Sequence, residues 1–280
     1  MSMGASIDVA ALPAKVALVT GASTGIGRAI AERLAADGFR AFGTSRNGGV
    51  SRAGVEMVEL DVVSDASVEA CVAAVLGRAG RVDVLVSNAG YLLGGAVEET
   101  TIEEARAQFE TNFFGAFRVI RALVPSMRAR GSGHIVNVTS LAGVVPLPFW
   151  GMYNASKFAL EGLTETLRFE LRPFGVAVSA IEAGLIKTRF YTDDRKAHAI
   201  AAYQPWHRRF RKKMAEFEAK APGPELVAAA VAKAVAAKSP ALRYRVTAEA
   251  TQFTLLRRFM PAGLYERALR LGFHLDDQRY

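Results

Sequence analysis

The stretch from Val16 to Gly27 reads VALVTGASTGIG and contains the strongest indication of the fold. Its first residues are apolar and β-branched, as in a buried strand, and the following segment places Ile30 and Leu34 on one helix face. Glycines at a strand-to-helix turn let the backbone approach a pyrophosphate, and the helix N-terminus offers free N–H groups and partial positive charge. Glycines also simply permit tight turns, so it is the position between strand and helix that favours a dinucleotide site.

Outward from this turn, short apolar runs alternate with longer segments of helical periodicity. Most runs are continuously apolar, as expected for strands covered on both faces, and the helical segments supply the crossovers that parallel pairing requires. We predict a doubly wound α/β fold, a Rossmann fold whose seven-stranded parallel sheet carries helices on both faces. The predicted strands are Val16–Thr20, Arg40–Thr44, Val55–Leu60, Val82–Ser87, His134–Thr139, Val176–Ile181 and Arg243–Thr247.

Length and composition indicate one soluble domain. Neither a charge block nor a Pro/Ser-rich linker divides the 280 residues, so we predict a single Rossmann-type domain over residues 1–280. Residues 1–14 lack the basic and apolar regions of a signal peptide and are expected to form a loose arm. No apolar run reaches the roughly 18 residues of a membrane span, and the single Cys71 suits a reducing compartment. We therefore expect a cytoplasmic protein without stable membrane insertion.

The net charge of +8 is basic, but lysines and arginines are spread along the chain apart from one cluster, His207–Lys213. A nucleic-acid patch could form there, although a solvated helix face, or a basic rim near an anionic or lipid-like ligand, is the favoured interpretation. We therefore expect no nucleic-acid partner. The four histidines stand apart from Cys and carboxylate clusters, so no metal site is predicted.

A second stretch, from Ser140 to Lys157, carries candidate catalytic groups. Tyr153 and Lys157 are four residues apart in a helical pattern, so they share one helix face. Free tyrosine has a pKa of about 10, and a nearby cation favours the phenolate, which moves the pKa toward neutral pH. Ser140 follows a strand-like run, where its hydroxyl could meet the same substrate oxygen. Taken alone, the pair could also be an ordinary feature of a helix.

Four motifs, in the family's order, make the chain resemble a short-chain dehydrogenase/reductase from Lys15 to Thr188. They are Thr-Gly-x-x-x-Gly-x-Gly at Thr20–Gly27, Asn-Ala-Gly at Asn88–Gly90, the serine at Ser140, and Tyr-x-x-x-Lys at Tyr153–Lys157. Within the family, the segment 155–162 and the C-terminal tail are most similar to hydroxysteroid- and retinol-dehydrogenase-like members.

The resemblance implies an NADP(H)-dependent oxidoreductase that interconverts an alcohol and a ketone or aldehyde, with a lipophilic small molecule as substrate. Tyr153 would give or take the proton, and Ser140 would polarise the substrate oxygen. Lys157 would lower the pKa of the phenol and hold the ribose.

The segment Thr101–Arg130 repeats apolar residues at spacings of three and four, which predicts a long helix with an apolar stripe beginning at Ile102. Asn112 adjoins this stripe, where a buried amide without hydrogen-bond partners would cost about 1–3 kcal/mol. In the family, an asparagine at this place anchors a water that relays protons toward the catalytic lysine. Packing is the alternative role.

The choice of cofactor rests on the end of the second predicted strand, which reads Thr44-Ser45-Arg46-Asn47. An NAD site usually places a carboxylate there to accept hydrogen bonds from the ribose, whereas Arg46 can pair with a 2′-phosphate. An exposed loop arginine is the alternative. Asp61 and Val62 resemble the family's adenine-contacting pair, or Asp61 simply ends a strand.

After the sixth predicted strand, Ala183 stands where relatives usually have proline, which leaves the turn beside the nicotinamide less constrained. Taken together, the residues predicted to bind the cofactor are Gly21, Ser23, Thr24, Gly25, Ile26, Gly27, Ser45, Arg46, Asp61, Val62, Asn88, Ala89, Gly90, Tyr153, Lys157, Gly184, Ile186 and Thr188.

Residues 190–222 are expected to cover the substrate, and residues 248–280 to form an amphipathic tail that could dock on the domain, a second subunit or a membrane surface. In relatives the helices corresponding to Thr101–Arg130 and Gly151–Arg172 pair across a two-fold axis, so we expect a homodimer. Two alternative functions stay open. An epimerase of the wider family would normally need a larger substrate domain, and a non-catalytic nucleotide-sensing or scaffold protein would tolerate loss of the catalytic residues, all four of which are present.

Overall fold

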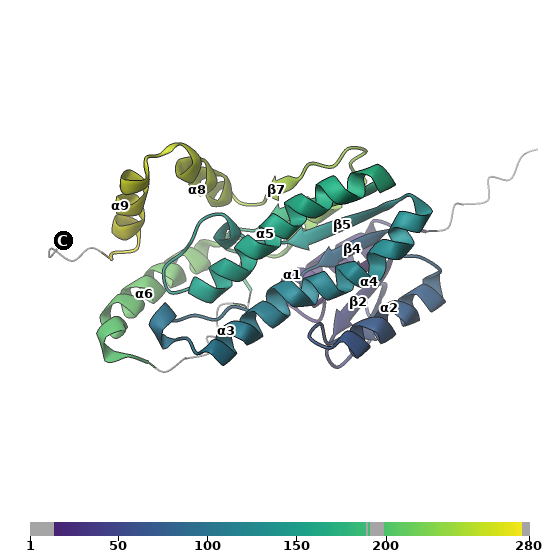
Figure 1. Cartoon of the computed structure of the whole chain (residues 1–280), viewed down its shortest axis with the longest axis horizontal. Helices are drawn as coiled ribbons and strands as arrows, with labels where there is room; N and C mark the ends of the chain where they lie inside the picture. Colours follow the sequence, from purple (N-terminus) through teal and green to yellow (C-terminus); the bar gives the residue numbers. More distant parts are fainter. Residues whose placement is uncertain (1–13, 189, 191–198, 276–280) are drawn as a thin grey trace, which may run out of the picture.

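The computed structural model describes residues 14–188, 190 and 199–275 (Figure 1). In this part of the chain, seven parallel strands form one sheet in the order β3-β2-β1-β4-β5-β6-β7. The predicted doubly wound sheet is confirmed. The strands are β1 (Val16–Val19), β2 (Arg40–Ser45), β3 (Val55–Glu59), β4 (Val84–Ser87), β5 (Gly133–Val138), β6 (Val176–Glu182) and β7 (Arg243–Arg245). Residues 1–13 of the expected arm and residues 191–198 of the expected substrate-covering segment lie outside the described residues.

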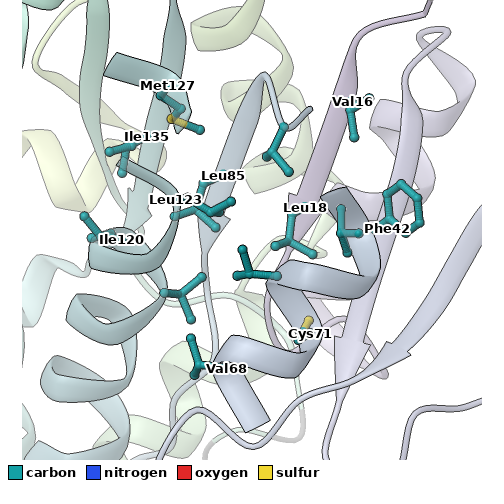
Figure 2. Packing of buried hydrophobic residues seen from close by; sticks show 14 of the residues in the cluster. Val16, Leu18, Phe42, Val68, Cys71, Leu85, Ile120, Leu123, Met127 and Ile135 are labelled. Atoms are coloured by element: carbon teal, nitrogen blue, oxygen red, sulfur yellow. The ribbon is translucent and has the colours of Figure 1, made fainter. Parts of the chain in front are cut away.

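Helices bury both faces of the sheet. They are α1 (Gly25–Ala36) and α7 (Glu225–Ala236) on one face, and α2 (Asp65–Ala79), α4 (Gly115–Arg130) and α5 (Gly151–Leu171) on the other. In β1, Ala17 and Val19 pack toward α1 and α7, whereas Val16 and Leu18 pack toward α2 and α4. Figure 2 shows this second cluster around Leu18 and Leu85. Because both faces of a central strand are covered, its sequence is continuously apolar.

The predicted helix Thr101–Arg130 contains an irregular turn. Its parts are α3 (Ile102–Phe109), a π-helical turn (Glu110–Phe114) and α4. The predicted apolar stripe is wrong at its start, because Ile102 is 63% exposed while the polar side chains of Gln108 and Asn112 are buried. The π-helical turn adds a residue to the helix, which changes the face that points inward. Two amides, those of Gln108 and Asn112, therefore face the interior in this part of the helix.

The described part of the C-terminal tail, residues 248–275, lies at one end of the sheet, above α6 in Figure 1. The elements at this end are α6 (Gln204–Lys220), α8 (Ala248–Phe259) and α9 (Ala262–Gly272). Phe273, directly after α9, packs against Phe210 of α6 with 5.2 Å between the ring centroids. β7 stops at Arg245 rather than at Thr247, because Thr247 instead caps α8 and accepts a hydrogen bond from Ala250 N. None of the helices in the described ranges combines the length and the apolar character that crossing a membrane requires.

Candidate active site

The turn between β1 and α1 requires glycine at three positions, where a side chain would be strained or would clash. Gly21 and Gly25 have φ values of 65° and 57°, in the left-handed region that favours glycine. A Cβ on Gly27 would lie 2.3 Å from the Gly21 carbonyl oxygen and 2.4 Å from Asn88 Nδ2. The N-cap residue, Thr24, makes no side-chain hydrogen bond to the first turn of α1, so the N–H groups of that turn can bind an anion. This cradle fits the pyrophosphate of a dinucleotide.

Asn88 and Ala89, which follow β4, form hydrogen bonds that hold the glycine-rich turn in place. Asn88 Nδ2 donates to the carbonyl oxygens of Thr20 and Gly21 at 2.9 and 3.2 Å. The Thr20 hydroxyl accepts hydrogen bonds from the backbone N–H groups of Asn88, at 2.9 Å, and Ala89, at 3.0 Å. The first position of the glycine motif therefore contributes a side chain that joins two strand ends, a role that the sequence analysis did not assign. Gly90 continues this segment toward Asn112, whose Oδ1 would lie 3.0 Å from a Cβ at position 90.

The end of β2 presents cations and no carboxylate. Ser45 Oγ donates a hydrogen bond to the Gly48 carbonyl oxygen. Arg46 is exposed, and no hydrogen bond or ion pair joins it to another described residue. Arg52, in the loop between β2 and β3, donates from Nη2 to the Ser23 carbonyl oxygen at 2.9 Å. The structure thus places Arg52 beside the glycine-rich turn, which no local pattern in the sequence indicates.

The two predicted adenine-contacting residues follow β3 and differ in what they expose. Asp61 Oδ1 accepts a hydrogen bond from Val63 N at 3.2 Å. Val62 is 7% exposed and packs in the core, where a Cβ on Gly115 would lie 2.7 Å from its Cγ2. Val62 can therefore offer a cofactor mainly its backbone.

The segment after β6 meets the glycine-rich turn. A Cβ on Gly25 would lie 3.6 Å from the Thr188 methyl carbon, so these two predicted residues are neighbours. A Cβ on Gly184 would lie 2.1 Å from Thr247 Oγ1, which means that the segment packs closely on the start of α8. Ile186 is buried against the core, at 1% exposure. The turn that has Ala183 in place of proline is thus held by tertiary contacts.

Tyr153 lies in the first turn of α5 and is 5% exposed. Its ring packs against Trp150 and Phe190, with centroid separations of 6.0 and 5.7 Å. Burial raises the pKa of Tyr153 to about 12, and a hydrogen bond between its hydroxyl and that of Ser140 opposes the rise. The phenol is therefore neutral at pH 7 and able to donate a proton to an oxygen placed beside it.

Lys157 lies one helical turn further along α5. Its Nζ donates to the Val138 carbonyl oxygen at 2.9 Å and lies 5.9 Å from the centroid of the Tyr153 ring. Burial lowers the pKa of Lys157 to about 8, and the charge of Glu161 opposes this shift. The expectation that the cation would bring the pKa of Tyr153 toward neutral does not hold in this arrangement, because burial of the phenol outweighs the other effects.

Asn112 occupies the π-helical turn and is 1% exposed. Its Oδ1 accepts from Tyr91 N at 3.0 Å, and its Nδ2 donates to Tyr91 O at 2.9 Å and to Ser156 Oγ at 3.3 Å. Ser156 in turn donates to the Tyr153 carbonyl oxygen at 2.8 Å. Asn112 is therefore connected to α5 through Ser156, which stands between Tyr153 and Lys157 in the sequence and was not predicted as a site residue.

The carboxyl ends of β1, β4, β5 and β6 bring most of the predicted residues to one edge of the sheet, where the strand order reverses between β1 and β4. Ligands of open α/β sheets bind at such a switch point. Arg46 lies further out, beyond the end of β2. No group of three or more His, Cys, Asp or Glu side chains that could hold a metal occurs in the described part of the chain. The site combines a dinucleotide cradle with a phenol, a hydroxyl and an ammonium, which together suit hydride and proton transfer.

Comparison with known proteins also indicates an oxidoreductase that uses a nicotinamide cofactor. The sequence model of the family described as short chain dehydrogenase matches residues 15–199. A 3-ketodihydrosphingosine reductase of Bacteroides thetaiotaomicron is 36% identical over 264 residues, which cover 92% of this chain and 98% of that protein. The 17-beta-hydroxysteroid dehydrogenase type 1 of Mus musculus is 36% identical over 277 residues, covering 89% of this chain and 78% of that protein.

Solved structures share the fold over most of their length. A short-chain dehydrogenase from Streptomyces avermitilis has a TM-score of 0.78 and 35% identity, and the match covers 94% of this chain and 100% of that one. A short chain dehydrogenase/reductase from Burkholderia phymatum in complex with NAD has a TM-score of 0.76 and 28% identity, with 88% and 93% covered. A variant of actinorhodin polyketide ketoreductase with NADPH has a TM-score of 0.67 and 33% identity, with 83% and 96% covered. This chain belongs to the short-chain dehydrogenases, a family of oxidoreductases that use a nicotinamide cofactor.

Proposed function

We propose that this protein is an NADP(H)-dependent oxidoreductase that interconverts a lipophilic alcohol and its ketone or aldehyde. The observation that carries the proposal is the Tyr153 phenol, which is hydrogen-bonded to Ser140 and surrounded by apolar rings. A protonated phenol of this kind can serve as the general acid for carbonyl reduction. The apolar surroundings favour a substrate that is itself apolar near the reacting carbon.

Each side chain has a defined task in this proposal. The bound cofactor supplies or accepts the hydride. During reduction, Tyr153 gives its proton to the substrate oxygen while the Ser140 hydroxyl donates a hydrogen bond to the same oxygen. Lys157, with a pKa of about 8, is cationic at pH 7 and stabilises the negative charge left on the phenol oxygen. Asn112 fixes the turn that presents Tyr153 and anchors a water through which the proton is replaced.

The preference for NADP(H) is supported by the end of β2. Relatives of this fold have been solved with NAD and with NADPH, so the chain's own residues decide the question. Arg46 is exposed and available to a 2′-phosphate, and Arg52 lies against the glycine-rich turn. The neutral Ser45 stands where a carboxylate would accept hydrogen bonds from the NAD ribose.

The surroundings of Tyr153 support a lipophilic substrate. An open pocket of about 460 Å³ lies beside α6 and is lined mostly by apolar residues, among them Val97 and Trp206. Phe149, also in its wall, lies 5.5 Å from Phe210, measured between ring centroids, and Phe210 belongs to the apolar cluster around Tyr153. This is the volume of a small-molecule site. The names of the two relatives, a 3-ketodihydrosphingosine reductase and a 17-beta-hydroxysteroid dehydrogenase, agree with an apolar substrate. We propose that the described part of the segment 190–222 covers this substrate.

The proposal is tested by following NADPH absorbance while the protein is offered a panel of lipophilic ketones and aldehydes, and NADP⁺ with the corresponding alcohols. We expect turnover of several long-chain or polycyclic members and little turnover of short polar ones. NADPH binding without turnover of any member would instead favour a nucleotide sensor. Isomerisation without net change in NADPH would indicate an epimerase.

We also propose a homodimer formed by α4 and α5. These helices expose Phe117, Phe158 and Phe169 at 38%, 37% and 76% of their surface, and Phe114, directly before α4, is 43% exposed. Several large apolar side chains on neighbouring exposed helices are typical of a protein interface.

Light scattering at micromolar concentration should give twice the protomer mass of 30.0 kDa. Phe169→Lys should shift the mass toward the protomer, because a charge at a buried interface is costly. Val50→Lys, at a residue that is 86% exposed in the β2–β3 loop, is the matched control and should leave the dimer intact. A protomer mass for the unmodified protein would contradict the proposal.

A further inference from the structure

Five charged side chains meet one helical turn beyond the catalytic lysine. Arg243 Nε lies 3.1 Å from Glu161 Oε2 and 3.0 Å from Glu182 Oε1, and its Nη1 lies 3.1 Å from Glu165 Oε1. Arg245 Nε donates to Glu182 Oε2 at 2.9 Å. Glu161 and Glu182 are buried, at 5% and 0% exposure, whereas the side chain of Glu165 is 49% exposed. The cluster joins α5, the end of β6 and β7.

Stability alone does not explain two buried carboxylates. Replacing a buried ion pair with apolar residues of similar volume is often neutral or stabilising, because the charges lose their hydration. Arg243 contacts Glu161 through Oε2, whereas Oε1 is buried, so the arginine compensates only one side of the carboxylate. A role for Glu161 in the chemistry of the neighbouring site accounts for its placement better than packing does.

Glu161 follows Lys157 by one turn of α5. They are four residues apart and both buried, so their side chains lie on one face of the helix. A Cβ on Gly143 would lie 3.0 Å from the Lys157 carbonyl oxygen and 3.2 Å from Glu161 Cγ, which shows that the chain presses against both turns. The other groups at Lys157 are the Tyr153 ring, on α5, and the Val138 carbonyl, at the end of β5.

We propose that Glu161 is a positioning residue that keeps Lys157 cationic, and that Arg243 keeps Glu161 ionised for this task. A buried ammonium tends to lose its proton, and Glu161 is the charged neighbour that opposes this for Lys157. Burial likewise raises the pKa of Glu161; the charge of Glu182 raises it further, and a hydrogen bond with Thr139 and the charge of Arg243 lower it. In this way Arg243, on the edge strand β7, acts on Lys157 indirectly, through the charge of Glu161.

The charge on Lys157 can be measured without a substrate. We would label the lysine Cε carbons of the full-length protein with ¹³C and follow them by NMR during a pH titration, assigning Lys157 as the signal lost in Lys157→Met. In Glu161→Gln, the titration midpoint of Lys157 should fall by about one to two pH units, because an attractive charge has been removed. Glu161→Asp, which keeps the charge but draws it back by one methylene, should lower the midpoint by a smaller amount.

Glu165→Gln is the matched control. It removes the exposed carboxylate from the same arginine, so the Lys157 midpoint should move by less than about 0.3 pH unit. An unchanged midpoint in Glu161→Gln would overturn the proposal. Should that variant not fold, the smaller shift in Glu161→Asp decides the question, and its absence has the same meaning.

The catalytic part of the inference rests on the proposed function and has its own readout. With a ketone identified in the screen, the alkaline limb of the kcat profile for reduction should move to lower pH in Glu161→Gln by the same amount as the Lys157 midpoint, while the KM for the ketone stays unchanged. Lys157 carries its charge below its pKa, so the shift makes activity disappear earlier as the pH rises. A shifted midpoint with an unmoved kcat profile would refute the positioning role. Because the NMR experiment needs no substrate, failure of the proposed function would leave its result interpretable.

Discussion

Replacing Tyr153 with phenylalanine is expected to lower kcat by about 10²–10⁴-fold, the usual contribution of a general acid or base. The substitution removes one hydroxyl and keeps the ring that packs between Trp150 and Phe190. The shape of the site and the binding of NADPH should therefore change little. Steady-state rates on a ketone from the screen, together with fluorescence titration of NADPH, measure the two quantities separately.

The matched control is Tyr244→Phe, which also removes a single hydroxyl. The Tyr244 hydroxyl accepts a hydrogen bond from Ala241 N beside β7, and nothing in the proposed chemistry uses it. Its kcat should stay within about twofold of the original, as for a substitution away from the reacting groups. A Tyr153→Phe variant with near-normal kcat would show that another group transfers the proton.

The second large effect is a change of cofactor. A charge-assisted hydrogen bond contributes roughly 1.5–3 kcal/mol, so pairing of Arg46 with the 2′-phosphate should favour NADPH over NADH by about 10- to 100-fold. The combined substitution Ser45→Asp with Arg46→Ala should reverse this order, because it removes the cation and adds a carboxylate that repels the phosphate and accepts hydrogen bonds from the ribose. Titration of both proteins with both reduced cofactors measures the reversal.

Ionic strength and a surface variant provide the controls. The preference of the unmodified protein should shrink at high salt, because exposed charges are screened over about 10 Å at 0.1 M. Arg33→Ala removes a cation from α1 that pairs with Asp37, and it should leave the preference unchanged. Equal or tighter binding of NADH by the unmodified protein would mean that Arg46 points into solvent.

The sheet was predictable because a strand whose two faces are both covered has a continuously apolar sequence, and the central strands have such sequences. In β1 all four side chains are buried, and the sequence is continuously apolar. The inward face of the segment around Asn112 was not predictable in the same way. Hydrophobic periodicity assumes 3.6 residues per turn and an apolar buried face, and the π-helical turn with the buried amides of Gln108 and Asn112 departs from both.

The candidate site, too, could be predicted from the sequence only in part. Motif spacing brought Ser140, Tyr153 and Lys157 together, since those positions follow from one strand end and one helix face, and their catalytic roles stay a prediction. The direction of the pKa shift of Tyr153 was not predictable, because it depends on rings brought over the phenol from elsewhere in the chain. The position of Arg52 beside the glycine-rich turn was not predictable for a similar reason, since its contact with Ser23 depends on how the β2–β3 loop folds.

The edge strand β7 affects whether two copies of this protein aggregate in a concentrated solution. An exposed strand edge offers unpaired N–H and C=O groups to any other chain, and such pairing leads to aggregation. β7 is only three residues long and carries Arg243 and Arg245. Short length and charge at an edge both discourage pairing with a foreign strand. We therefore expect the arginines that hold Glu161 and Glu182 to protect this side of the sheet from self-association as well, so that replacing either should lower solubility in addition to disturbing the ion pairs.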